Sequence, residues 1–198
     1  MTNVRSADYA WITVDDPYLL DEGFCLSVFS PATVDDVLAG LPAVTESSTG
    51  DLGALCDLAW DNGRDLIGGV LQVGESVVLY EPYGYLDDDA KQSLSTGRVA
   101  VSVDGNLAAS HFRFYRDGAL VTMFEHMFAD SRQGNDPDAV LPLMEQVGGF
   151  DLDRGPEDDP ALDANYLASS FALCEAITGA RLTYRLMSES QFLICRFA

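Results

Sequence analysis

The stretch "HFRFYRDGALVTMFE" (111–125) carries the strongest structural signal in the chain and decides the fold class. Two strand-like runs flank the dipeptide Asp-Gly at 117–118, which suits the tight turn of a β-hairpin. Because successive side chains of a strand point to opposite faces, Phe112 and Phe114 share one face and His111 lies on the other. The stretch therefore predicts two antiparallel strands with one apolar and one polar face.

Further strands are predicted on both sides of this hairpin. Short runs rich in β-branched and aromatic residues, bounded by turn residues, are typical of strands. Such runs predict a buried strand at 23–29, a hairpin from 65–73 and 76–82, a strand at 98–103, and a closing hairpin from 181–187 and 191–197. The polar stretch "TESSTG" (45–50) is predicted to be a loop.

Helices are predicted between these strands from their caps and their apolar spacing. Thr33 and Asp136 have side chains that cap helix starts, and they predict helices that end at Pro42 and near Gly149. Further helices are predicted at 51–63, 88–94 and 159–179. Strands in runs, with helices grouped between them, are typical of α+β proteins. The sequence therefore predicts a single α+β domain over residues 1–198, with a largely antiparallel sheet and three to five helices.

The charge balance of the chain is strongly acidic. It has 32 acidic residues against 11 Lys and Arg, which gives a formal net charge of −21 and a pI near 4.1. A GC-rich genome or adaptation to high salt would explain this composition, and so would attraction to a basic partner. Direct binding of nucleic acid is not expected, because phosphate backbones require a basic stripe and no window of the sequence has one.

The cysteines and the hydropathy of the chain bear on its compartment. The four cysteines form no CxxC motif, and the first residues lack the long apolar run of a signal peptide. No apolar stretch approaches the roughly 18 residues of a membrane span. The sequence thus predicts a cytoplasmic protein with reduced, mostly buried thiols and no membrane association.

The acidic stretch "FDLDRGPEDDPALD" (150–163) has three alternative interpretations. Asp151 and Asp153 resemble the start of a calcium-binding loop, but Pro156 and Leu162 stand where that loop needs Gly and Glu. The stretch also lies between two predicted helices, where its prolines would keep it a solvated loop. The third interpretation is an interaction surface. We expect no metal and no cofactor.

The chain shows no catalytic signature. Phosphate-binding, dinucleotide-binding, nucleophile-elbow and zinc-protease motifs are all missing from the sequence, so no catalytic residue is predicted. His111 and His126 could meet across the hairpin and form a cluster with Glu125, but a metal site would need a further defined ligand. An enzyme remains an alternative, with a carboxylate-lined cleft near Glu81, Asp104 and Glu125.

Several stretches together indicate a family. They are "EGFCLSVFSPATVDDVLAGL", "VVLYEPYGYL", "LSTGRVAVSVDGNLAASHFRFYRDGALVTMFE", "SRQGNDPDAVLPLMEQVG" and "AITGARLT". In order and spacing they resemble an uncharacterised family of actinobacterial proteins, a domain of unknown function, from about Tyr9 to Thr183. The resemblance implies no activity, and it supports a genomic origin of the acidic composition.

The leading hypothesis is an acidic protein-binding module. It would neutralise a basic toxin or nuclease, as an immunity protein or an inhibitor does, through charge-steered docking. Acids beside aromatic residues suit the rim and anchors of such a surface. Two clusters qualify as candidate binding residues: Tyr83, Tyr85, Asp87, Asp88 and Asp89, and Phe150, Asp151, Asp153, Glu157 and Asp158. Besides the enzyme, a structural or regulatory subunit is the remaining alternative.

Overall fold

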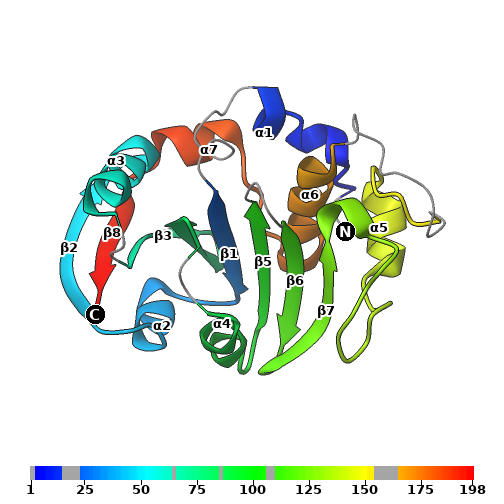
Figure 1. The fold of residues 1–198 in the computed structure, drawn as a ribbon, viewed down its shortest axis with the longest axis horizontal. Coiled ribbons are helices and arrows are strands. Elements are labelled where there is room, and N and C mark those ends of the chain that lie inside the picture. Colours follow the sequence, from blue (N-terminus) through cyan, green and yellow to red (C-terminus); the bar gives the residue numbers. More distant parts are fainter. Residues whose placement is uncertain (1–2, 15–22, 64–65, 85–86, 106–109, 154–164) are drawn as a thin grey trace.

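All eight strands join one antiparallel sheet (Figure 1). The structure is a computed structural model, and it describes residues 3–14, 23–63, 66–84, 87–105, 110–153 and 165–198. The spatial order is β2-β8-β3-β4-β1-β5-β6-β7. The strands are β1 (Phe24–Ser30), β2 (Val44–Gly50), β3 (Ile67–Val73), β4 (Ser76–Pro82), β5 (Val99–Gly105), β6 (His111–Arg116), β7 (Ala119–Glu125) and β8 (Phe192–Phe197).

Helices cover both faces of this sheet. The larger layer holds η1 (Ser6–Tyr9), α1 (Trp11–Val14), α3 (Leu52–Asn62), α5 (Leu141–Val147), α6 (Tyr166–Thr178) and α7 (Tyr184–Glu189). The smaller layer holds α2 (Val34–Ala39) and α4 (Asp88–Leu94), which lie at the bottom of Figure 1. A short 3-10 helix, η2 (His126–Phe128), follows β7. Among the described residues, no helix is long and apolar enough to cross a bilayer.

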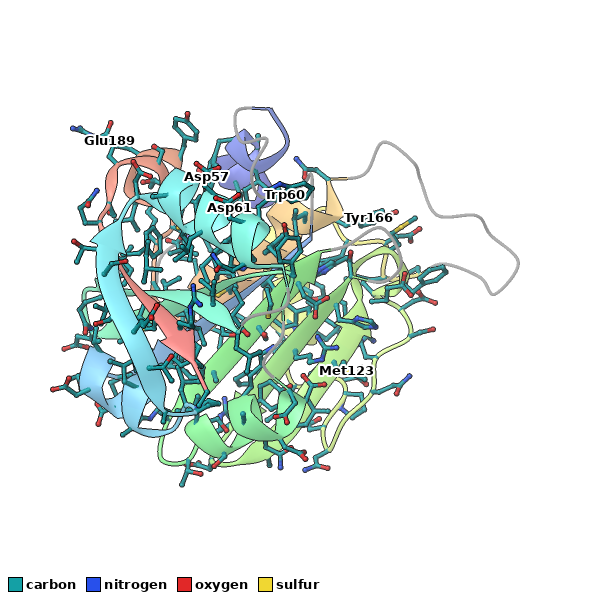
Figure 2. The ribbon with its side chains drawn as sticks, turned by 60° about the vertical axis from the view of Figure 1, so that its left-hand side comes forward. Asp57, Trp60, Asp61, Met123, Tyr166 and Glu189 are labelled. Carbon is teal, nitrogen blue, oxygen red and sulfur yellow. The ribbon has the colours of Figure 1, made fainter. Side chains whose placement is uncertain are left out.

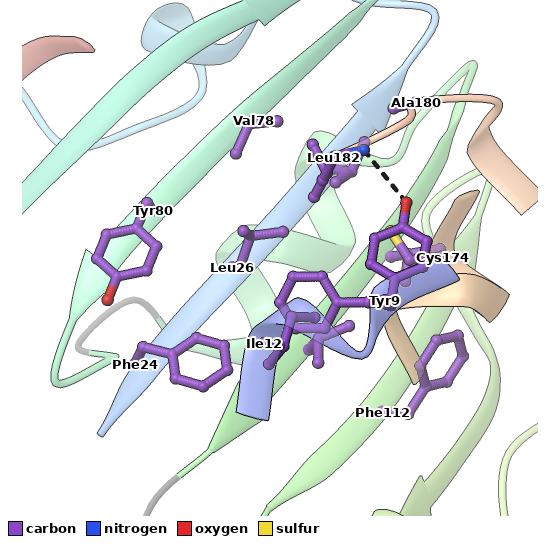
Figure 3. Packing of buried hydrophobic residues seen from close by; sticks show 14 of the residues in the cluster. Tyr9, Ile12, Phe24, Leu26, Val78, Tyr80, Phe112, Cys174, Ala180 and Leu182 are labelled. Atoms are coloured by element: carbon purple, nitrogen blue, oxygen red, sulfur yellow. Dashed lines mark hydrogen bonds between the residues drawn. The ribbon is translucent and has the colours of Figure 1, made fainter. Parts of the chain in front are cut away.

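The alternation of side chains along the strands separates two cores. Leu26 and Val28 of β1 belong to the core beneath α6, whereas Phe29 belongs to the core beneath α2 and α4. In the larger core, Tyr9 is buried with its hydroxyl satisfied, because it accepts a hydrogen bond from the Leu182 backbone N–H at 3.2 Å (Figure 3). A buried tyrosine needs such a partner for its polar tip.

The predicted fold class is confirmed, but three local predictions are wrong. Residues 44–50 form β2, not a loop, and they pair with β8. Residues 184–189 form α7, not the first arm of a hairpin, and Thr183 caps the helix by accepting from Leu186 N–H. Asp136 does not cap a helix, since α5 begins at Leu141. The helix predicted from residue 159 is described from its cap Asn165 onward, and its earlier part lies outside the described residues.

The last strand of the sheet has a protected edge. The segment after η2 runs back along β7, and Met123 and Gln133 exchange two backbone hydrogen bonds of 2.8 Å. The backbone of Asp136 continues this contact by donating to the Val121 carbonyl at 3.0 Å. An edge covered in this way does not offer its backbone to another chain. The covering segment also forms one wall of the site described next.

Candidate functional site

A row of polar side chains crosses one face of the sheet. The strand register sets Cys25 on β1 opposite Glu81 on β4 and opposite Asp104 on β5. Asp104 accepts a hydrogen bond from the backbone N–H of His111 on β6 at 2.7 Å, and His111 faces Glu125 on β7. These five residues form what we call the polar row, and they lie on the face that α4 covers. All three carboxylates of the predicted enzyme cleft belong to it.

At one end the polar row is buried and closed by α4. Lys91, the single lysine of the chain, is 4% exposed and lies with its Nζ 3.8 Å from Glu81 Oε2. The same Nζ donates to Cys25 Sγ at 3.2 Å, and the Ser102 hydroxyl lies 3.2 Å from that sulfur. Burial alone would lower the pKa of Lys91, but Cys25 and Glu81 raise it overall, so the lysine stays charged.

The thiol at the centre of this cluster is not poised for nucleophilic attack. Burial raises the pKa of Cys25, and the charge of Glu81 raises it further, against the opposing effect of Lys91. The thiolate is the reactive form of cysteine, so a raised pKa makes the group inert at neutral pH. Cys25 is also only 1% exposed. Its role in the described structure is to accept the lysine hydrogen bond.

In the middle of the polar row, an arginine neutralises two carboxylates. Arg113 forms an ion pair with Asp104 through Nη1, and its Nε lies 3.2 Å from Oδ2 of Asp88, in the first turn of α4. Tyr115 donates a hydrogen bond to Asp88 Oδ1 at 3.1 Å. Burial alone would lower the pKa of Arg113, but Asp104 and Asp88 raise it overall. This network fastens α4 to the sheet and leaves Asp104 engaged with a counter-charge.

At its other end the polar row opens into a hollow. The hollow has a volume of about 320 Å³ and is lined by His111, Met123, Phe124, Glu125, Phe128, Ser131 and Gln133. The Glu125 side chain is half-buried there, and within the described part of the chain it makes no hydrogen bond or ion pair. His111 turns toward the interior of the row instead, with its Nδ1 3.7 Å from Asp104 Oδ1. Among the described residues, the hollow therefore has a carboxylate without a counter-charge.

The first predicted binding cluster lies beside the polar row. Asp87 caps α4 by accepting from the Ala90 N–H at 2.8 Å, Asp88 binds Arg113, and Asp89 is exposed. Tyr83 is half-buried against the larger core and has a positive φ of 72°. It therefore packs inward, which differs from the exposed anchor proposed for it. Tyr85 lies outside the described residues.

The second predicted binding cluster is described only in part. Phe150 is half-buried and packs edge-on against Phe124, with ring centroids 5.6 Å apart. Asp151 is half-buried and Asp153 is exposed. Glu157 and Asp158, and with them the calcium-loop interpretation, lie outside the described residues. The structure thus gives Phe150 a packing role and leaves the remainder of this cluster as a prediction.

The second histidine, His126, is buried, and its two ring nitrogens contact Ser170 and the Asp104 backbone, not the side chains of the polar row. Ser170 donates to His126 Nδ1 at 2.7 Å, and His126 Nε2 lies 2.8 Å from the Asp104 carbonyl oxygen, to which it donates in the neutral ring. Burial lowers the pKa of His126 to about 4, so the ring is neutral at physiological pH. Within the described ranges, no three His, Cys, Asp or Glu side chains come together as metal ligands.

The most exposed large hydrophobic residue of the described structure was missed by the sequence analysis. Trp60 on α3 is 64% exposed and lies between Asp57 and Asp61, apart from Met123 of the hollow (Figure 2). The helical spacing gave a signal for it, because Leu52, Leu55 and Ala59 form the buried stripe of α3 and position 60 falls outside that stripe. Trp60 lies on a convex helix surface, whereas Glu125 lies in a hollow.

Comparison with known proteins places the chain in a family. Residues 2–197 match the model of a family of unknown function, DUF6461. The chain belongs to this family. No curated protein and no solved structure matches the chain. Membership of DUF6461 confirms the resemblance to an uncharacterised family, and the argument for function rests on the geometry of the site.

Proposed function

We propose that this DUF6461 protein is a cytoplasmic, non-enzymatic module that binds a basic protein, and that it acts as an immunity protein or inhibitor toward a basic toxin or nuclease. The observation that carries the proposal is the half-buried carboxylate of Glu125, which lies in a hollow and has no counter-charge among the described residues, on a chain of net charge −21. A basic partner would supply that counter-charge, and the overall charge would steer its approach.

The exposed acids of α4 extend this surface. Asp88 contacts Arg113, and Arg113 faces Met123 of the hollow across the β6–β7 pair. Asp87, Asp88 and Asp89 therefore lie on the same side of the sheet as Glu125. We call these four acids, together with the hollow, the acidic face. A concave centre with a charged rim is a common arrangement in protein interfaces.

The remainder of the polar row supports binding more than catalysis. Glu81 has a buried lysine partner and Asp104 a half-buried arginine partner, and burial raises the pKa of the Cys25 thiol, so it is protonated at neutral pH. A general base needs a carboxylate or imidazole that is free to take a proton from a substrate. Glu81 lies 3.8 Å from the Lys91 ammonium, and Asp104 is paired with Arg113, so each faces a cation of the chain instead of an open site. These two acids thus have structural roles on the sheet.

The proposal is tested by capture of a basic partner with charge-matched variants. The immobilised wild type, the face variant Asp89→Asn/Glu125→Gln and the control variant Asp57→Asn/Asp61→Asn would be exposed to a lysate of the source cells. We expect the wild type and the control variant to retain the same basic protein at low salt and release it at high salt, and the face variant to retain much less. Equal retention by all three, or capture of no basic protein, would contradict the proposal.

An enzyme is a second candidate because of one contact in the same hollow. Asp104 Oδ1 lies 3.7 Å from His111 Nδ1, longer than a hydrogen bond, and a closer approach would place a carboxylate behind the imidazole as in a general base. A screen with chromogenic ester, phosphoester and amide substrates tests this candidate. Turnover that His111→Ala abolishes, with the fold intact, would favour the enzyme over the binding module.

A further inference from the structure

We propose that the hollow beside Glu125 is a receptor for a guanidinium group, and that an arginine side chain of the basic partner enters it. This inference rests on the proposed function for its biological partner, but the receptor can be tested without one. It names the chemical group that the acidic face would recognise and the residue that would carry its specificity.

The carboxylate of Glu125 is the acidic group that lines the hollow. The residue ends β7, and His111, which faces it across the strand pair, forms its ion pair with Asp104 and none with Glu125. The Glu125 side chain therefore keeps both oxygens available within the described structure. A guanidinium binds a carboxylate through two parallel N–H···O hydrogen bonds, which an ammonium cannot form.

The walls of the hollow suit a flat cation. Phe128 is 37% exposed and lines the hollow with Met123, so aromatic and thioether surface lies beside the carboxylate. Guanidinium groups stack on aromatic rings and are weakly hydrated, whereas ammonium groups hold their water strongly. The part of the hollow lined by Met123 and Gln133 is fixed by the two 2.8 Å hydrogen bonds between their backbones. A wall formed in advance lowers the entropic cost of binding.

The two described arginines nearest the hollow in sequence, Arg113 and Arg132, are engaged by other groups. Arg113 is engaged by Asp104 and Asp88. Arg132, which lies between two lining residues in sequence, donates from Nη2 to Asp138 at 2.8 Å and also to the Ala129 carbonyl. A metal ion is disfavoured, because one carboxylate is far from the six or more oxygens that a hard cation needs. Among the described residues, therefore, no Lys or Arg supplies this counter-charge, and a bound cation would do so.

The experiment is a titration of the full chain, labelled with ¹⁵N, with three capped amino acids. The probes are N-acetyl-arginine methylamide, its lysine counterpart and its citrulline counterpart, which keeps the shape of arginine without the charge. We expect saturable chemical-shift changes at the amides of His111, Phe128 and Gln133 with the arginine probe, at about millimolar affinity, as befits a single fragment. The lysine probe should bind several-fold more weakly, and the citrulline probe should not saturate.

Glu125→Gln should weaken the arginine probe at least tenfold, whereas Asp57→Asn, an exposed acid elsewhere, should leave its affinity unchanged. Equal binding of the three probes, or shifts confined to other regions, would overturn the inference. If Glu125→Gln fails to fold, the comparison of probes on the wild type still decides. If the wild type captures a basic protein but does not bind the arginine probe, this inference alone is rejected. Probe binding without any captured protein would reject the proposed function alone.

Discussion

Protonation of His126 should make the fold sensitive to mild acid. The ring is 3% exposed, and its pKa falls from 6.5 to about 4 because burial disfavours the charged form. In the unfolded chain the ring titrates near 6.5, so below that pH the unfolded state binds a proton that the folded state does not. Stability that is fully present above pH 6.5 is therefore lost as the pH falls toward the folded pKa. The loss that this one residue contributes should reach roughly 3 kcal/mol.

The measurement compares wild type with His126→Gln in urea unfolding between about pH 7.5 and pH 4.5. Gln can still accept from Ser170 and donate to the Asp104 carbonyl, but it does not titrate. The many carboxylates also titrate in this range, and their contributions cancel in the difference between the two proteins. We expect the wild type to be more stable near neutral pH and to lose this advantage on acidification. A difference that stays constant across the range would refute the reasoning.

The remaining predictions concern the buried polar groups. Lys91→Met should lower the free energy of unfolding in urea by about 3–5 kcal/mol, because it leaves the buried charge of Glu81 without its lysine. Adding Glu81→Leu should restore most of the lost stability. A double variant no more stable than Lys91→Met would contradict this. All four cysteines are free, so a thiol reagent should count four equivalents in denaturant without reductant and far fewer in the native protein, in which three are buried. Burial raises the pKa of Tyr115, so stability should fall as the pH rises above about 10, where the unfolded tyrosine ionises first, and Tyr115→Phe should lose less over that range.

Local patterns were enough to predict the elements whose structure is set locally. The 111–125 hairpin, the 65–82 hairpin and the helix at 88–94 depend on turn residues, caps and alternation within one stretch, and each is present. Strand β2 was missed because six of its seven side chains are exposed, which leaves no apolar alternation to recognise. It is a strand because β8, far along the chain, pairs with it. Tertiary pairing of this kind overrides local preference.

The same distinction applies to the site. The hairpin turn placed His111 opposite the stretch from Met123 to His126, and the structure pairs it with Glu125. Glu81, Asp104 and Glu125 were proposed together from their places at strand ends. The central position of Cys25 depends on β1 lying between β4 and β5, which is a non-local arrangement. The contact between Lys91 and Cys25 requires both that arrangement and the docking of α4. Neither leaves a periodic signal in the sequence.

The two ends of the polar row show why the acidic composition of the sequence could not indicate which carboxylate binds a partner. Glu81 has been removed from water, which costs several kcal/mol for an ion, and Lys91 at 3.8 Å offsets that cost within the folded chain. Glu125 is half-buried in an open hollow and retains access to water, so the free protein tolerates its charge without a partner. A cation that entered the hollow would complete the desolvation and supply the ion pair in the same step. An added cation can therefore form a new ion pair with Glu125, the incompletely buried carboxylate. The carboxylate of Glu81 already forms its ion pair within the folded chain.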